Sequence, residues 1–244
     1  MSHQTQEAKI HGENSIFSRI QNYLGEFVYG GIDGSITTFA VVAGAAGANL
    51  ESSIVIILGF ANLIADGFAM SVGSYLSTKS EKETYQKHKE IEYWEVDNLP
   101  EKEREEVREI YAAKGFDGEL LEKVVDVITA DKDRWVDLMM KEELEMAEET
   151  KSPIKMGAIT FLSFILFGFI PLVIYVIDYF NPLGYNLFLI SSTLTGLCFV
   201  GIGFLKSLAT NTKRLKSVME TLLLGGAAAT LSYFVGDFLE KLVR

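Results

Sequence analysis

Cysteine and histidine are scarce in this chain. Its 244 residues include one cysteine, Cys198, and three histidines, of which His3 and His11 stand near the N-terminus. A single cysteine excludes a disulfide framework and a zinc site built from cysteines. Three histidines placed in this way exclude a histidine-rich metal cage.

Basic residues are outnumbered as well. The chain has 22 Lys and Arg against 33 Asp and Glu, which gives a formal net charge of −11. It has no basic stripe to neutralise phosphates, so we expect no nucleic acid partner. The first 15 residues are polar and lack the apolar region of a secretory signal, so no cleavable signal peptide is expected.

The charged residues are concentrated in one block of an otherwise apolar chain. Residues 77–151 hold 13 basic and 23 acidic residues, whereas the rest of the chain holds 9 basic and 10 acidic residues. Apolar residues make up 48% of the whole sequence. An ordinary soluble globule does not separate its apolar and charged residues in this way.

Five apolar segments lie outside this block. Each has about 20 residues or slightly more, the length that crosses a hydrocarbon core of about 30 Å. A buried helix of a soluble protein seldom runs so far without a polar face. The five segments are residues 27–50, 54–76, 156–177, 185–205 and 218–239.

The pattern predicts an all-α fold, a five-transmembrane-helix bundle with a helical acidic cytoplasmic domain inserted between helices 2 and 3. Lys and Arg are frequent in the acidic block and in the loop before the last segment, and absent from two other links. This asymmetry places the N-terminus, the block and that loop in the cytoplasm. The expected parts are an arm at 1–26, helices 1–2 at 27–76, a metal-binding domain at 77–152 and helices 3–5 at 153–244.

Small residues are frequent in the membrane segments. Gly30, Gly31 and Gly34 open the first segment, and a run of Gly and Ala closes it. Small residues let membrane helices approach closely. We expect a tight bundle with a helix–helix interface between subunits; the alternative is simple tolerance of glycine in membrane helices.

Two carboxylates fall inside the predicted membrane helices. Asp33 lies in the first and Asp66 in the second, where a charge costs about 2.5–3.5 kcal/mol on insertion scales and marks a functional site by default. Asn62, Asp66 and Met70 are four residues apart and share a helix face. Antiparallel packing of the two helices would bring Asp33 and Met70 to one depth. The structural alternatives are a helix cap for Asp33 and a packing role for Met70.

A carboxylate beside a thioether favours particular metals. Mg²⁺ and Ca²⁺ prefer shells of oxygen alone, and copper(I) requires several sulfurs. A mixed set is typical of softer first-row ions, so the expected cargo is Fe²⁺, Mn²⁺, Co²⁺ or Zn²⁺.

The acidic block reads as helices with a break at Pro100 and a last helix running towards Pro153. Pairs of possible ligands recur three or four residues apart, which places both members on one helix face. No Glu-x-x-His pair is present, so the usual di-iron arrangement is missing. Solvated helix faces are the structural alternative. The candidates are Glu92, Glu95, Glu103, Glu106, Met139, Met140 and Glu143.

Three runs carry a resemblance to a known family. GIDGSITTFAVVAGAAGA, ANLIADGFAMSVGSYLSTKSE and DRWVDLMMKEEL resemble the vacuolar iron transporter family, of the yeast vacuolar iron/manganese transporter type, from about Tyr29 onward. The resemblance implies a homodimer that moves Fe²⁺ out of the cytoplasm in exchange for protons. It also implies a transport path through Asp33 and Met70, and metal binding by the seven candidates of the acidic block. Asn62 replaces a glutamate found in some relatives, which leaves the proton-coupling residue open.

The sequence thus predicts a transporter of Fe²⁺, with Mn²⁺ as a second possible cargo, and no resident cofactor. A membrane-bound ferroxidase and a metal sensor that uses the acidic domain are the competing hypotheses. The expected partners are the metal cation, protons, the lipid bilayer and a second copy of the chain. The expected location is a bacterial inner membrane, or the vacuolar membrane if the organism is a eukaryote.

Overall fold

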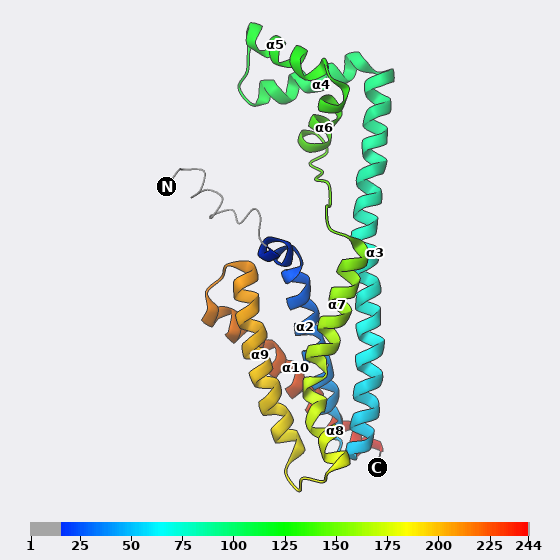
Figure 1. The fold of residues 1–244 in the computed structure, drawn as a ribbon, viewed down its shortest axis with the longest axis vertical. Coiled ribbons are helices and arrows are strands. Elements are labelled where there is room, and N and C mark those ends of the chain that lie inside the picture. Colours follow the sequence, from blue (N-terminus) through cyan, green and yellow to red (C-terminus); the bar gives the residue numbers. More distant parts are fainter. Residues whose placement is uncertain (1–15, 244) are drawn as a thin grey trace. The chain divides into compact units, whose positions relative to one another are not determined.

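The computed structural model describes residues 16–243, and within them every regular element is a helix (Figure 1). Residues 1–15 of the predicted arm lie outside the described residues. The all-α prediction is confirmed. The elements are α2 (Ile16–Gly47), α3 (Ser52–Asn98), α4 (Pro100–Ala113), α5 (Gly118–Thr129), α6 (Lys132–Glu142), α7 (Pro153–Gly168), η1 (Ile170–Leu172), α8 (Val173–Phe180), α9 (Leu187–Thr210) and α10 (Arg214–Val243).

The chain divides into two compact units. The first, here the membrane unit, comprises Met1–Tyr75 and Ser152–Arg244; the second, here the acidic unit, is Leu76–Lys151. Within residues 16–243, five helical stretches are long and apolar enough to cross a membrane, which confirms the predicted number of spans. One of them is α3, whose 47 residues would measure about 70 Å, so only its apolar first part is needed to cross about 30 Å of hydrocarbon.

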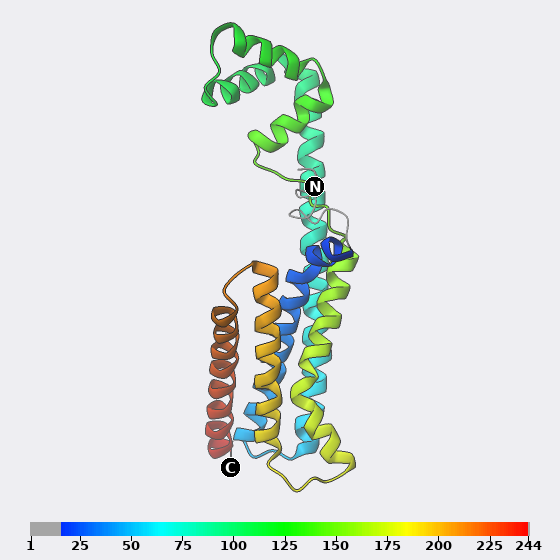
Figure 2. The ribbon, with the colours of Figure 1, turned by 60° about the vertical axis from the view of Figure 1, so that its left-hand side comes forward.

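Within the membrane unit, α2 packs against α7, α9 and α10 (Figure 2). Its core contains Phe39, Val42, Leu63 and Phe164. The glycines of α2 are used in these contacts, because a Cβ at Gly34 would meet the backbone of Phe164 on α7. The small residues at the start of α2 therefore serve close packing inside one chain, and they need no second subunit to explain them.

The third predicted membrane segment is interrupted. Residues 156–177 read as one helix, but the structure has α7, the 3-10 turn η1 and α8 in their place. Pro171 lies in the turn, where its missing N–H cannot continue the helical hydrogen bonds. The hydroxyl of Ser191 on α9 donates a 2.7 Å hydrogen bond to the carbonyl of Pro171, which satisfies a backbone group at the break.

In the acidic unit, α4, α5 and α6 surround a core that includes Val107, Val125 and Trp135. Helix α6 starts at a cap in which the Asp131 carboxylate accepts a 2.8 Å hydrogen bond from the N–H of Arg134. The predicted continuation of this helix to Pro153 is wrong, because α6 ends at Glu142. Glutamates dominate the sequence beyond that point, and negative charge opposes the negative end of a helix.

Candidate metal site

The predicted glutamates are positioned by a sharp turn between two helices of the acidic unit. Glu92 and Glu95 lie one turn apart near the end of α3. A single residue separates the end of α3 from Pro100, the first residue of α4. Proline suits a first helical position because its ring fixes the backbone angle and its missing N–H is not needed there. The turn brings Glu103, in the first turn of α4, back towards the two glutamates of α3.

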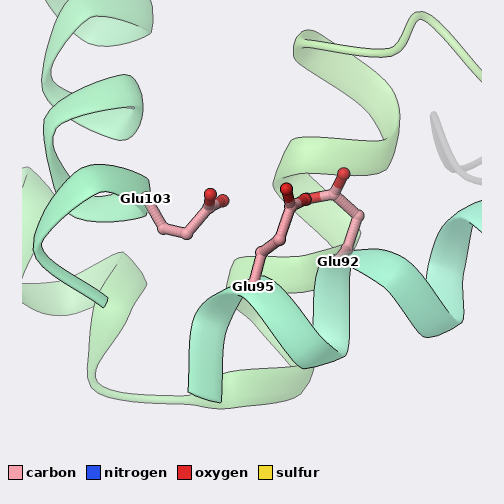
Figure 3. Close-up of side chains that lie close together, drawn as sticks. All are labelled: Glu92, Glu95 and Glu103. Atoms are coloured by element: carbon pink, nitrogen blue, oxygen red, sulfur yellow. The ribbon is translucent and has the colours of Figure 1, made fainter. Parts of the chain in front are cut away.

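Two overlapping groups of carboxylates result. The first joins Glu92, Glu95 and Glu103, and the second joins Glu103, Glu106 and Glu143; within each, one oxygen per residue lies within 4.8 Å of the others. Figure 3 shows Glu103 reaching from α4 towards the paired carboxyl groups of Glu92 and Glu95 on α3. We call these five residues the glutamate cluster. Glu103 belongs to both groups and links them.

The cluster is partly buried, and carboxylate oxygens of its central members lack hydrogen bonds among the described residues. Glu103 has 1% of its surface exposed and Glu92 has 3%. Neither oxygen of Glu103, nor Oε2 of Glu92, makes a hydrogen bond among the described residues. Buried carboxylates without donors are costly, because they lose hydration and gain nothing in return. A divalent cation would supply the missing partner.

The charge of the cluster has a consequence for protonation. Burial, together with repulsion from Glu106, Glu92 and Glu95, raises the pKa of Glu103 to about 7. Burial, together with repulsion from Glu143, Glu95 and Glu106, likewise raises the pKa of Glu92 to about 7. Burial, followed by repulsion from Glu106, also raises the pKa of Glu143. Near neutral pH, Glu92 and Glu103 therefore bind protons that an isolated glutamate would have released.

A lysine borders the cluster. The ammonium of Lys102 lies 2.7 Å from a carboxylate oxygen of Glu106 and 3.8 Å from one of Glu103. It opposes the rise in pKa of Glu92, Glu103 and Glu143. Sequence reasoning missed Lys102, although its position directly before Glu103 and four residues before Glu106 was a usable signal.

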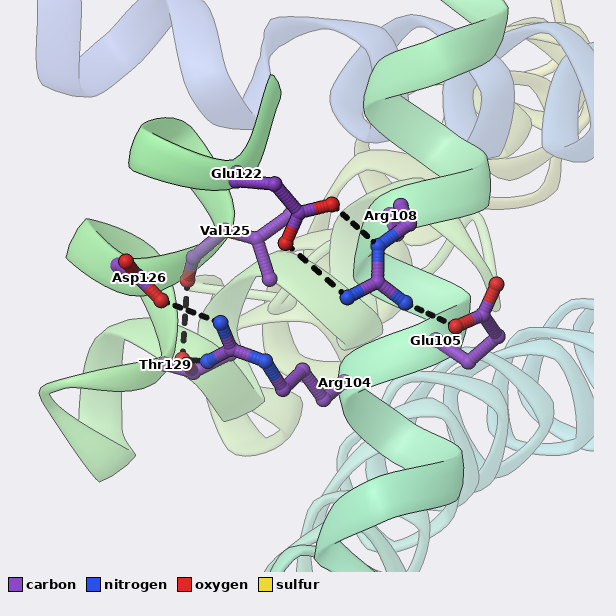
Figure 4. Close-up of polar contacts among 7 residues, drawn as sticks. All are labelled: Arg104, Glu105, Arg108, Glu122, Val125, Asp126 and Thr129. Atoms are coloured by element: carbon purple, nitrogen blue, oxygen red, sulfur yellow. Dashed lines mark hydrogen bonds and ion pairs between the residues drawn. The ribbon is translucent and has the colours of Figure 1, made fainter. Parts of the chain in front are cut away.

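Two arginines hold α4 against α5 (Figure 4). The guanidinium of Arg108 donates to both carboxylate oxygens of Glu122, at 2.8 and 3.2 Å, and also pairs with Glu105. Arg104 donates to the hydroxyl of Thr129 at 2.9 Å and pairs with Asp126. Paired hydrogen bonds of this kind fix orientation as well as distance. They stabilise the helix that carries Glu103 and Glu106.

The predicted methionines lie in the core of the acidic unit. Met139 and Met140 are fully buried on α6, packed in the same apolar cluster as Trp135 and Val136. The backbone carbonyl of Met139 also accepts a 3.0 Å hydrogen bond from the N–H of Glu143, which closes the end of α6. The structure thus gives both side chains a packing role.

The predicted transport residues lie half-buried in the membrane unit. Asp33 is on α2, whereas Asn62, Asp66 and Met70 are on α3. Met70 packs against the apolar core. The side-chain nitrogen of Asn62 is buried and has no hydrogen-bond partner among the described residues. A polar group left without a partner in the membrane is expensive and fits a functional role.

One further carboxylate of the first membrane helix escaped the sequence reasoning. Glu26, half-buried on α2, accepts a hydrogen bond from the hydroxyl of Thr160, which is buried on α7. Glu26 precedes Asp33 by seven residues and therefore lies on the same helix face. That spacing was the available signal, but the predicted segment began at residue 27.

Known proteins resemble this chain over most of its length. The sequence profile of the VIT family matches residues 24–237. A vacuolar iron transporter of Toxoplasma gondii is 35% identical over 91% of this chain and 76% of its own length. The vacuolar iron transporter of Plasmodium falciparum is 34% identical over 95% of this chain and 86% of its own. Vacuolar iron transporter 1 of Arabidopsis thaliana is 32% identical over 88% of this chain and 85% of its own length.

These relatives are eukaryotic, so they give no support to a bacterial inner membrane as the location. Their names and the family profile indicate a membrane transporter of a metal ion and not an enzyme. The resemblance predicted from the sequence is confirmed, and the chain belongs to the VIT family.

Proposed function

We propose that this chain exports Fe²⁺, and also Mn²⁺, from the cytoplasm in exchange for protons. The observation that carries the proposal is the pair of linked carboxylate groups around Glu103, whose buried oxygens accept no hydrogen bond from the described part of the chain. Fe²⁺ and Mn²⁺ accept carboxylate oxygen ligands. The glutamate cluster would capture the ion from the cytoplasm, with Met139 and Met140 as further ligands from the adjoining core.

The membrane path would run through Asp33 and Met70, with Asp66 and Asn62 beside it. A carboxylate inside the membrane is costly without a cation or a proton, and this supports a role for both Asp33 and Asp66. Because a carboxylate binds either a proton or a metal, passage of the ion in one direction would drive protons in the other. We propose Asp33 and Asp66 as the groups that couple the two.

The working unit would be a homodimer in a lipid bilayer. The acidic unit would face the cytoplasm, since its Lys and Arg residues favour that side. The membrane would be the vacuolar one in a eukaryote, as the names of the relatives suggest, and the cell membrane in a bacterium.

Flux into proteoliposomes tests the proposal. The purified full chain should carry Fe²⁺ and Mn²⁺ into the liposomes in preference to Zn²⁺. The flux should be faster when the lumen is more acidic than the outside, because protons then leave as the metal enters. It should consume no oxygen. Asp33→Ala should abolish the flux, whereas Asp237→Ala should preserve it, because Asp237 pairs with Lys241 near the end of α10. Full flux in Asp33→Ala would reject the path, and equal flux with or without the gradient would reject the antiport.

A further inference from the structure

Lys102 places a positive charge at the edge of the glutamate cluster. Its ammonium approaches Glu106 to 2.7 Å and Glu103 to 3.8 Å, and both carboxylates belong to the group completed by Glu143. Among the described residues, the ion pairs that involve the cluster are those of Lys102. A lysine side chain stays charged at neutral pH, since its ordinary pKa is about 10.4. A monovalent cation is therefore tethered beside the carboxylates that would hold a divalent one.

The two sides of this contact differ in their freedom to move. The side chain of Lys102 is 61% exposed, whereas those of Glu106 and Glu103 are 25% and 1% exposed. A long, flexible lysine stem can carry its charge out into water at little cost. Glu103, enclosed by the fold, cannot follow. The contact can therefore open by movement of the lysine alone, and the carboxylates stay in place.

We propose that Lys102 is a built-in competitor of the metal ion. Its ammonium balances part of the charge of Glu103, Glu106 and Glu143, and a divalent ion must displace it in order to bind. This role rests on the proposed function of the cluster as a metal-capture site. Lys102 acts as a positioning residue that sets how tightly the site holds its ion; it is not a ligand.

The competition has a use in a transporter. Five clustered glutamates with no cation beside them would bind a divalent ion tightly and release it slowly. An ammonium that returns to the carboxylates as the ion leaves lowers the barrier to release, because the site is never left with its full negative charge. Lys102 thus lowers the affinity of the site for a divalent ion and raises the rate at which the ion is released.

The chain offers a matched control in Lys141. Its side chain is 61% exposed and pairs at 2.7 Å with Asp137, four residues away, as Lys102 does with Glu106. Asp137 is not a member of the glutamate cluster. Lys141→Ala therefore removes an equivalent surface ion pair and leaves the cluster alone. Lys102→Arg keeps the charge at the site and serves as the conservative variant.

Binding of Mn²⁺ to the full chain in detergent tests the proposal, measured by calorimetric titration and by the rate of ion release into excess chelator. Loss of one nearby charge should tighten binding about tenfold in Lys102→Ala and slow release by a similar factor. Lys102→Arg and Lys141→Ala should match the wild type. Lys102→Leu, which retains the apolar stem, replaces the alanine variant if that one does not fold.

A second measurement separates competition from a structural role. Without metal, Lys102→Ala should lower the urea midpoint of the acidic unit, whereas saturating Mn²⁺ should raise that midpoint more than in the wild type. If Lys102 had only a structural role, Lys102→Ala would lower the urea midpoint both without metal and with saturating Mn²⁺. Equal or weaker Mn²⁺ binding by Lys102→Ala, beside a wild type that binds, would overturn the proposal and leave the proposed function standing. A wild type that binds neither Mn²⁺ nor Fe²⁺ would overturn both.

Discussion

Glu92 and Glu103 come from different helices and share one buried group of carboxylates, with their nearest oxygens within 4.8 Å. Their side chains are 3% and 1% exposed, so neither carboxylate can be solvated in place. Two buried like charges this close are stable only when a proton or a cation lies between them. Proton binding and metal binding are therefore alternatives at this point of the fold.

The first prediction concerns the pH dependence of metal binding. Glu92 and Glu103 each have a pKa raised to about 7, mainly by burial. Below that pH a metal ion must displace protons, so its apparent affinity should fall by at least about tenfold per pH unit between pH 6 and pH 5. Above about pH 8 it should level off. Mn²⁺ titrations of the full chain at several pH values measure this, and a flat profile would contradict it.

The second prediction concerns the stability of the metal-free acidic unit. A glutamate in the unfolded chain has its ordinary pKa of 4.5, whereas folding raises the pKa of Glu103 to about 7. The folded state thus binds more protons between these values, and its stability should fall as pH rises through that window. Glu103→Gln removes the buried charge. It should stabilise the unit at pH 8 by on the order of 2 kcal/mol, and change it little at pH 5.

Urea unfolding followed by tryptophan fluorescence measures this in the whole protein. The chain has two tryptophans, and both, Trp94 and Trp135, lie in the acidic unit. Glu103→Gln should also lose Mn²⁺ binding. Glu109→Gln is the matched control, since Glu109 lies exposed on the same helix outside the cluster. A loss of stability at pH 8 in Glu103→Gln would count against a buried, unpaired carboxylate.

Parts of the fold can be predicted from the sequence where a single physical requirement determines them. The thickness of a bilayer sets the length of an apolar span, so the uncharged run at 185–205 leads directly to α9. Helix spacing likewise puts Glu92 and Glu95 on one face. Both inferences use only neighbours along the chain, which is why they hold without any knowledge of tertiary contacts.

Other features depend on residues that are distant in sequence. Pro171 is a local signal for the interruption at Ile170–Leu172, but the hydroxyl that satisfies its carbonyl comes from Ser191 on another helix. Spacing also cannot separate Glu103, which is buried, from Glu105, which is exposed and paired with Arg108 on the same helix. Which face of α4 is covered is decided by α3, α5 and α6, and only the folded arrangement shows it.

The third prediction concerns the thioether of Met70. This side chain packs against the apolar core of the membrane unit, so a volume-conserving change to leucine should preserve the fold. It removes a soft ligand. Met70→Leu should therefore reduce transport of Fe²⁺ and Co²⁺ several-fold more than that of Mn²⁺, which prefers oxygen ligands. Competition assays in proteoliposomes measure the ratio. Met219→Leu on α10, 47% exposed, is the control, and an unchanged ratio in Met70→Leu would exclude sulfur from the path.

The fourth prediction concerns the close approach of α2 and α7. A Cβ at Gly34 would meet the backbone oxygen and Cα of Phe164, neither of which can move without shifting the helix. Gly34→Ala should therefore destabilise the membrane unit by about 2–3 kcal/mol or more, and disturb the neighbouring Asp33. Gly201→Ala on α9 is the matched control, because nothing lies within 4 Å of its added Cβ. Thermal stability in detergent, followed by size-exclusion chromatography, should fall for Gly34→Ala and should not fall for Gly201→Ala, since alanine favours a helix more than glycine does. Equal stability of the two would show that α2 and α7 do not depend on this contact.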